Sequence, residues 1–340
     1  MIFERKGIDF LRGIGCLVIM LYHFIPSSGS PLVSSILLEV GHAAMCMFFT
    51  ASAFILTNSM LKMKENNTYS FKVYMQKRFF RIIPVWWFFL FFYCLYYQPE
   101  LKHVLANILF YFGFLQHIEG YNFVQLAWSL FVEECIYLIL PVTLLYVKTS
   151  LRSVILFIFG IIIYILWGRY VPLIFPGDPQ NIWMRHPVQH FVDFTFGLLI
   201  YFNFNKLQFN KSSMLLHQVT YLLLFITSLV SVYYQIYFMA GGLIVLCMTS
   251  KNFISKLFVS RPFTVFQYMG VRCLSLYLVH DLVIIIIHKT LKYLGREDLK
   301  TSPSIWLILV FIGLCILISH LTYKHIELKS IGLRKYFKQS

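Results

Sequence analysis

Charged side chains are scarce in this sequence. Only 13% of its 340 residues are Asp, Glu, Lys or Arg, and 14 residues are acidic. About a quarter of the residues in a typical soluble domain are charged, so the composition argues against an ordinary soluble protein. We also find no internal repeat, no low-complexity tract and no cysteine spacing typical of a metal site or a disulfide framework. These absences argue against solenoids, zinc modules and small disulfide-stabilised scaffolds.

Apolar residues are abundant: 59% of the residues are hydrophobic, and many of them form long apolar runs. We expect an all-α integral membrane protein, one domain over 1–340 built as a single bundle of about ten transmembrane helices. The expected spans are 10–26, 36–61, 79–97, 126–147, 151–167, 186–203, 215–234, 236–250, 273–294 and 305–323. The run 104–117 is short and contains Asn107, so we expect it to be re-entrant or interfacial.

The basic residues predict the orientation of these spans. If 104–117 does not span, both termini are cytoplasmic and most of the 29 Lys and Arg residues fall on the inner side, as the positive-inside rule requires. The outer side then keeps only Lys102, Arg169, Arg185, Lys289, Lys292, Arg296 and Lys300. Membrane topology accounts for most of the net charge of +15, so we expect no nucleic-acid partner.

Two ionisable residues share one face of the first span. Arg12 and His23 are eleven residues apart, which on an α-helix places them within about 20° of each other and roughly 16 Å apart along the axis. Ionisable side chains inside a span are costly and normally face a protein interior or an aqueous cavity. The others of this kind are Asp9, Glu133, Glu134, Asp193, His280, Asp281 and Glu327. Each could also be a purely structural anchor or a satisfied polar group.

The segment "RFFRIIP" begins the third span with Arg78 and Arg81, which share a helix face. One interpretation is an ordinary cytoplasmic anchor. The other is a fork for a phosphate-rich cosubstrate, since guanidinium groups bind phosphate bidentately.

Six segments, in order, resemble the membrane-bound acyltransferase-3 family, whose bacterial members O-acylate cell-surface polysaccharides. They are "IDFLRGIGCLVIMLYH", "FFTASAF", "RFFRIIP", "WSLFVEECIYLILP", "SLYLVH" and "YKHIE". Ala53 stands where the family usually has glycine, which puts close backbone contact there in doubt, and Lys329 replaces a usual proline.

The resemblance implies transfer of an acetyl group from cytoplasmic acetyl-CoA, a cosubstrate rather than a bound cofactor, to a sugar hydroxyl of O-antigen, capsule, exopolysaccharide or a lipid-linked precursor. His23 would be the general base, and Glu133 would fix its tautomer or stabilise the imidazolium. Arg12, Arg78 and Arg81 would hold the CoA phosphates, and no metal is implied. Supporting residues would be Asp9, Ser52, Trp128, Ser129, Tyr277, His280 and Glu327. Direct transfer is favoured over an acyl-enzyme, and the oxyanion donor stays open among Ser129, Trp128, Ser52 and Tyr277.

Rival interpretations remain. Intramembrane Arg, His and Glu would also suit a transporter or flippase of a sugar–lipid precursor, although the missing internal symmetry argues against it. An unrelated membrane O-acyltransferase family and a catalytically inactive scaffold fit the motifs less well. We expect the bacterial cytoplasmic membrane as the location, and the external segment 168–187 as the contact for the acceptor.

Overall fold

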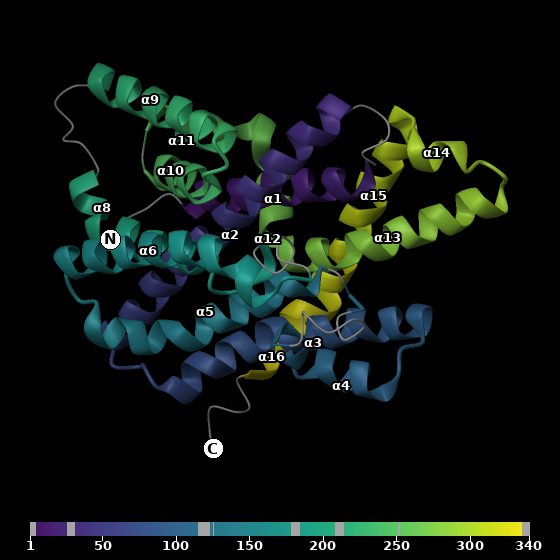
Figure 1. Ribbon diagram of the computed structural model, residues 1–340, viewed down its shortest axis with the longest axis horizontal. Helices are drawn as coiled ribbons and strands as arrows, with labels where there is room; N and C mark the ends of the chain where they lie inside the picture. The colour runs from purple at the N-terminus through teal and green to yellow at the C-terminus, as the bar shows by residue number, and fades with distance from the viewer. Residues whose placement is uncertain are drawn as a thin grey trace. The chain divides into compact units, whose positions relative to one another are not determined.

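The structure is a computed structural model that describes residues 5–25, 31–114, 123–124, 126–177, 184–207, 214–250 and 252–334. Within these ranges every regular element is a helix and none is a strand (Figure 1). The helices form two compact units whose segments alternate along the chain. Unit 1 consists of Met1–Phe48, Phe79–Phe89 and Lys211–Ser340, and unit 2 of Phe49–Arg78 and Leu90–Asn210.

Helix α1 (Arg5–Phe24) is the central helix of unit 1, where it packs against α10, α11, α12 and α13. Helices α13 and α15 also lie side by side (Figure 1). Besides α1, unit 1 contains the first part of α2 (Pro31–Glu65), part of α3 (Phe71–Tyr97), α9 (Met214–Tyr233), α10 (Tyr237–Thr249), α11 (Phe253–Val259), η2 (Arg261–Phe263), α12 (Thr264–Val271), α13 (Cys273–Tyr293), α14 (Asp298–Thr301), α15 (Ile305–Thr322), η3 (Tyr323–Glu327) and α16 (Leu328–Leu333).

Two glycines let α1 and α12 approach to backbone contact. A Cβ atom on Gly13 would lie 1.8 Å from the carbonyl oxygen of Phe266, and one on Gly270 would lie 1.7 Å from that of Asp9. Small residues at helix crossings are the usual means of close packing in membrane bundles. This crossing therefore fixes the half of α1 that carries Arg12, which is the half that the sequence predicts to be cytoplasmic.

Unit 2 contains the second part of α2, the two ends of α3, α4 (Leu101–Ile108), η1 (Tyr111–Phe114), α5 (Ala127–Tyr146), α6 (Ser150–Ile174) and α8 (Phe191–Leu207). A glycine on α8 allows close contact with α2: a Cβ atom on Gly197 would lie 2.5 Å from the carbonyl oxygen of Thr50 and 2.6 Å from the Cβ of Ala53. The close approach that Ala53 put in doubt is thus made possible by the partner helix.

Among the described residues, seven helical segments are long and apolar enough to cross a bilayer, and eight if the bent pair α10 and α11 counts as one span. Two shorter apolar helices, Phe191–Phe204 and Leu222–Tyr233, coincide with two further expected spans. The chain is therefore an all-helical, multi-pass membrane protein. The count of ten spans and the cytoplasmic position of both termini stay predictions.

Several helices extend beyond the expected spans. Helix α3 begins at Phe71, eight residues before the expected start, and α6 continues to Ile174. Residues 168–174 of the expected acceptor segment are therefore helical, and its residues 178–183 lie outside the described part of the chain. Hydropathy misses such extensions because they carry charged residues, Lys72 and Lys77 in α3 and Arg169 in α6.

The run 104–117 contains no long helix in its described part. Helix α4 has 8 residues, so it is about 12 Å long, far short of a bilayer. Asn107, buried within it, donates a hydrogen bond to the carbonyl of His103 at 2.9 Å. Residues 115–117 lie outside the described ranges.

Candidate functional site

Arg12 and His23 both lie on α1, a continuous helix of 20 residues, so they share a face as predicted. The His23 side chain is exposed and that of Arg12 is half-buried. Helix α1 therefore presents a cation and an imidazole at two levels of one helix face.

Three arginines lie near one buried carboxylate in unit 1. Glu327 is 2% exposed, accepts a hydrogen bond from the Ser275 hydroxyl at 3.0 Å, and lies within electrostatic range of Arg81, Arg12 and Arg272. We call these four residues, Arg12, Arg81, Arg272 and Glu327, the arginine cluster. Asp9 lies beside it, within range of Arg12, Arg5 and Arg81. The cluster has more positive than negative charge and suits a polyanionic group.

A local irregularity of the helix accompanies the inward position of Glu327. The segment "YKHIE", residues Tyr323–Glu327, is a π-helical turn at the end of α15. Such turns change the register of the side chains and often occur at functional sites. The next helix is tied to α3 by a hydrogen bond from the Ser330 hydroxyl to the carbonyl of Phe80. These contacts hold Glu327 and Arg81 in one unit.

Arg272 was missed by the sequence analysis. Its guanidinium lies 3.5 Å from the ring centre of Tyr268 and 4.8 Å from that of Tyr323, and its Nη1 donates to the carbonyl of Tyr268 at 3.0 Å. Contacts with two aromatic rings hold the guanidinium in place. The one sequence signal was its position, directly before the segment that contains "SLYLVH".

A second group of polar residues lies in unit 2, around Glu133 on α5. The Ser52 hydroxyl donates to Glu133 Oε1 at 2.7 Å, and the Tyr137 hydroxyl is a further hydrogen-bond partner of this carboxylate. The Arg78 guanidinium lies 5.5 Å from the Tyr137 ring centre and within electrostatic range of Glu134. We call Ser52, Arg78, Glu133, Glu134 and Tyr137 the carboxylate cluster.

Two buried atoms of this cluster have no hydrogen-bond partner among the described residues, Arg78 Nε and Glu134 Oε1. Buried polar atoms normally have a partner, so both are available to a water molecule or a ligand. Arg78 and Arg81 share α3, yet Arg78 interacts with Glu134 in unit 2 and Arg81 with Glu327 in unit 1.

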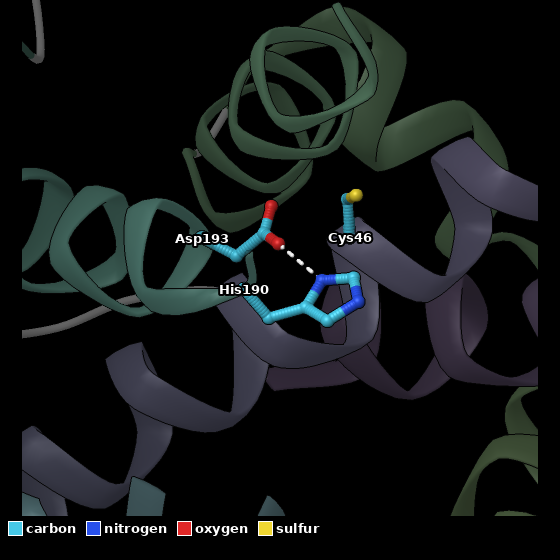
Figure 2. A group of neighbouring side chains, drawn as sticks. All are labelled: Cys46, His190 and Asp193. Carbon is cyan, nitrogen blue, oxygen red and sulfur yellow. Dashed lines mark hydrogen bonds and ion pairs between the residues drawn. The ribbon is translucent and has the colours of Figure 1, made fainter. Parts of the chain in front are cut away.

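Trp128 stacks on His190, with ring centres 5.7 Å apart, and Phe49 packs against the same imidazole at 4.6 Å. The His190 Nδ1 is 2.9 Å from Asp193 Oδ2 (Figure 2), and its Nε2 is 2.8 Å from the carbonyl of Met184. A carbonyl only accepts, so Nε2 carries a hydrogen. Both ring nitrogens of His190 are thus engaged, and the pair with Asp193 is explained as a buried structural unit.

Ser129, a predicted supporting residue, donates its hydroxyl hydrogen to the carbonyl of Leu126 at 3.2 Å and is buried. Its single hydroxyl proton is therefore committed to the backbone. Of the four predicted oxyanion donors, Ser129 and Ser52 each donate to a protein acceptor. Tyr277 packs its ring on His280 of the same helix, with ring centres 5.5 Å apart.

His23 and His280 form a histidine pair in unit 1. Their ring centres are 5.4 Å apart with an interplanar angle of 40°. Unit 1 thus brings together the predicted residues Asp9, Arg12, Arg81 and Glu327 in one group and His23, Tyr277 and His280 in another. Unit 2 brings together Ser52, Arg78 and Glu133.

His186 lies between α6 and α8 and has a perturbed titration. Its ring stacks on Trp167 at 4.6 Å, and its Nδ1 accepts from the backbone N–H of Val188 at 3.2 Å. Burial, followed by the positive potential of nearby His190, lowers the pKa of His186 to about 4. We expect this imidazole to be neutral at physiological pH.

The fold and these sites first define a class: a multi-pass helical membrane protein with clusters of ionisable side chains on its spans. The chain belongs to the acyltransferase-3 family, whose model, described as an acyltransferase domain, matches residues 5–324. It is similar to the peptidoglycan O-acetyltransferase OatA of Listeria monocytogenes serovar 1/2a (strain ATCC BAA-679 / EGD-e), with 24% identity over 380 aligned positions. The alignment covers 99% of this chain and 58% of that relative, so the chain spans somewhat over half of its length. No solved structure matches the chain.

Proposed function

We propose that this chain is a membrane O-acetyltransferase that moves an acetyl group from cytoplasmic acetyl-CoA to a sugar hydroxyl of a cell-surface polysaccharide or its lipid-linked precursor. Membership of the family supports acyl transfer, and the name of the Listeria relative supports a glycan as the acceptor. The observation that carries the proposal is α1, which has Arg12 of the arginine cluster in its first half and exposed His23 at its C-terminal end, on one face. The membrane is then the bacterial cytoplasmic membrane.

In this proposal the arginine cluster binds the phosphates of acetyl-CoA. Arg12, Arg81 and Arg272 supply planar guanidinium groups, which match phosphate oxygens bidentately. Glu327 is their internal counter-charge and offsets the mutual repulsion of the three guanidinium groups when no anion is bound. Arg78 lies near Glu134 and over Tyr137, and we assign it first to offsetting the negative charge of the carboxylate cluster, with phosphate contact as its second role.

His23 is the general base. Its neutral imidazole takes the proton of the sugar hydroxyl as the oxygen attacks the thioester carbonyl. The C–O bond forms, the C–S bond breaks, and the proton passes from the imidazolium to the departing thiolate of CoA. Glu133 stays a predicted catalytic residue that stabilises developing positive charge, and its hydrogen bonds from Ser52 and Tyr137 keep the carboxylate oriented.

The test measures the release of CoA thiol by the protein in lipid nanodiscs, with acetyl-CoA and a panel of glycans that includes peptidoglycan fragments. His23→Ala should lower the acceptor-dependent rate by about 10²- to 10⁴-fold, the range for loss of a general base. His103→Ala on α4 is the matched control and should keep the wild-type rate. Acceptor-dependent release that is indifferent to His23→Ala would overturn the assignment of the base.

A separate measurement tests the phosphate site. Arg81→Gln and Arg272→Gln should each raise the KM for acetyl-CoA about tenfold or more while the KM for the acceptor stays constant, since one charge-assisted contact contributes about 1.5–3 kcal/mol. Arg261→Gln, on η2, is the arginine control. A protein that neither binds acetyl-CoA nor releases CoA with any acceptor would contradict the proposal and favour the transporter.

A further inference from the structure

His280 has one ring nitrogen whose role the fold leaves unexplained. The side chain is 0% exposed, and its Nδ1 lies 2.6 Å from the carbonyl oxygen of Tyr277. A carbonyl cannot donate, so Nδ1 carries the hydrogen and the neutral ring presents a lone pair at Nε2. That Nε2 is buried and has no hydrogen-bond partner among the residues that the structure describes.

A buried acceptor without a partner costs about 1–3 kcal/mol. Native proteins satisfy nearly all such atoms, so an exception calls for a functional explanation. Packing alone does not explain a histidine here, because a phenylalanine would also place an aromatic ring in the core and would bury no unpaired nitrogen.

The neighbour of this ring is His23. The two ring centres are 5.4 Å apart, and α1 and α13 pack directly against each other. His23 is exposed and its ring centre lies 5.0 Å from that of Tyr22, whereas His280 is fully buried. One histidine is therefore accessible to a substrate, and the second lies behind it with a lone pair to offer. A hydrogen bond between the two rings requires that a nitrogen of His23 turns toward this Nε2.

We propose that His280 is the positioning residue of His23: its Nε2 accepts a hydrogen bond from a ring N–H of His23 and so leaves the other His23 nitrogen unprotonated for the acceptor hydroxyl. The inference rests on the proposed function. The hydroxyl proton moves to the free nitrogen of His23, and the resulting imidazolium keeps its second N–H on His280 until the CoA thiolate takes the transferred proton. His280 itself gains and loses no proton.

This arrangement gives His280 the orienting role that a carboxylate has in a hydrolase triad. A neutral partner orients the base without the strong rise in basicity that an ionised carboxylate would cause. The backbone carbonyl of Tyr277, one turn earlier on the same helix, fixes the tautomer on which the role depends.

The test compares His280→Phe with His280→Gln in the CoA-release assay. Phenylalanine keeps the ring volume and removes both nitrogens, whereas glutamine keeps an amide acceptor at the distance of Nε2. We expect His280→Phe to lower kcat about 10- to 100-fold with the KM for acetyl-CoA unchanged, a smaller loss than that of the base itself. His280→Gln should retain at least about a third of the wild-type kcat.

The double variant His23→Ala, His280→Phe should be no slower than His23→Ala alone, because His280 acts through His23. A wild-type kcat for His280→Phe, or equal losses for Phe and Gln in equally stable proteins, would refute the inference and leave the proposed function intact. Full activity of His23→Ala would instead overturn the proposed base. His288→Phe, a half-buried histidine of the same helix, controls for the substitution itself.

Discussion

The contact between α1 and α12 allows a quantitative prediction for Gly13→Ala and Gly270→Ala. In each case the new Cβ atom would overlap a carbonyl oxygen of the opposite backbone, at 1.8 Å and 1.7 Å respectively. A backbone atom cannot rotate away as the end of a side chain can, so the helices must separate. Overpacking costs about 1–3 kcal/mol, and we expect the upper end here.

Part of this cost is offset, because alanine is favoured over glycine inside a helix by about 1 kcal/mol. The net destabilisation expected for each variant is therefore about 2 kcal/mol. Gly313→Ala on α15 is the matched control: its Cβ would have nothing within 4 Å, so only the helix-propensity gain of up to about 1 kcal/mol remains.

Thermal unfolding of the detergent-solubilised protein, followed by loss of helical circular dichroism, measures these differences. The two destabilisations should not add, since helices separated by the first methyl group have room for the second. Displacement of α1 should also raise the KM for acetyl-CoA, because Arg12 is adjacent to Gly13. Midpoints for Gly13→Ala and Gly270→Ala equal to that of Gly313→Ala would refute the reasoning.

Two further predictions concern unit 2. Ser52→Ala removes the donor of a hydrogen bond to Glu133 and should destabilise the protein by about 1.5–3 kcal/mol, while Ser52→Thr should restore the bond. Ser129→Ala, whose hydroxyl donates to the backbone carbonyl of Leu126 and not to a carboxylate oxygen of Glu133, is the control, and equal unfolding midpoints for the two alanine variants would contradict this prediction. For His186 the folded-state pKa of about 4 lies below the unfolded value near 6.5, so the unfolded state binds more protons between these values and stability is lost as the pH falls through that window. Because the ring is partly exposed and solvent screens its charge, we expect the free energy of unfolding to fall by only about 1–2 kcal/mol between pH 7 and 4. The unfolding midpoint of His186→Gln should fall less over this range than that of the wild type, and identical pH profiles would show that His186 does not titrate as described.

Much of the fold could be predicted from the sequence. Long apolar runs specified an all-helical membrane protein, and the positions of α1, α5, α13 and α15 agree with the expected spans to within about five residues. The extension of α3 back to Phe71 was not predicted, because a hydropathy window ends where polar residues begin, although the backbone there stays helical. The π-helical turn at Tyr323–Glu327 has no composition signal at all.

The candidate site was predicted as separate pieces. Arg12 and His23 could be placed on one face because helix periodicity is a local property. The side chains that contact Arg12, His23 and Glu133 from other helices could not be predicted. Glu133 was expected to act beside His23, and the structure gives it Ser52 and Tyr137 as hydrogen-bond partners within unit 2. Arg272 gave almost no signal, since a basic residue before a span is the ordinary topogenic pattern.

By itself the sequence determined the helices, the shared face of Arg12 and His23, and the family motifs, because each depends on residues close together in the chain. Tertiary structure alone decided that Arg272 and Arg81 lie with Arg12 around Glu327, and that Arg78, three residues before Arg81, lies among the carboxylates of α5. It also left the Nε2 of His280 as a buried acceptor beside His23. The physical reason is that electrostatic and hydrogen-bond partners are chosen by which helices pack together, a property of distance in space that hydropathy and spacing along the chain do not encode.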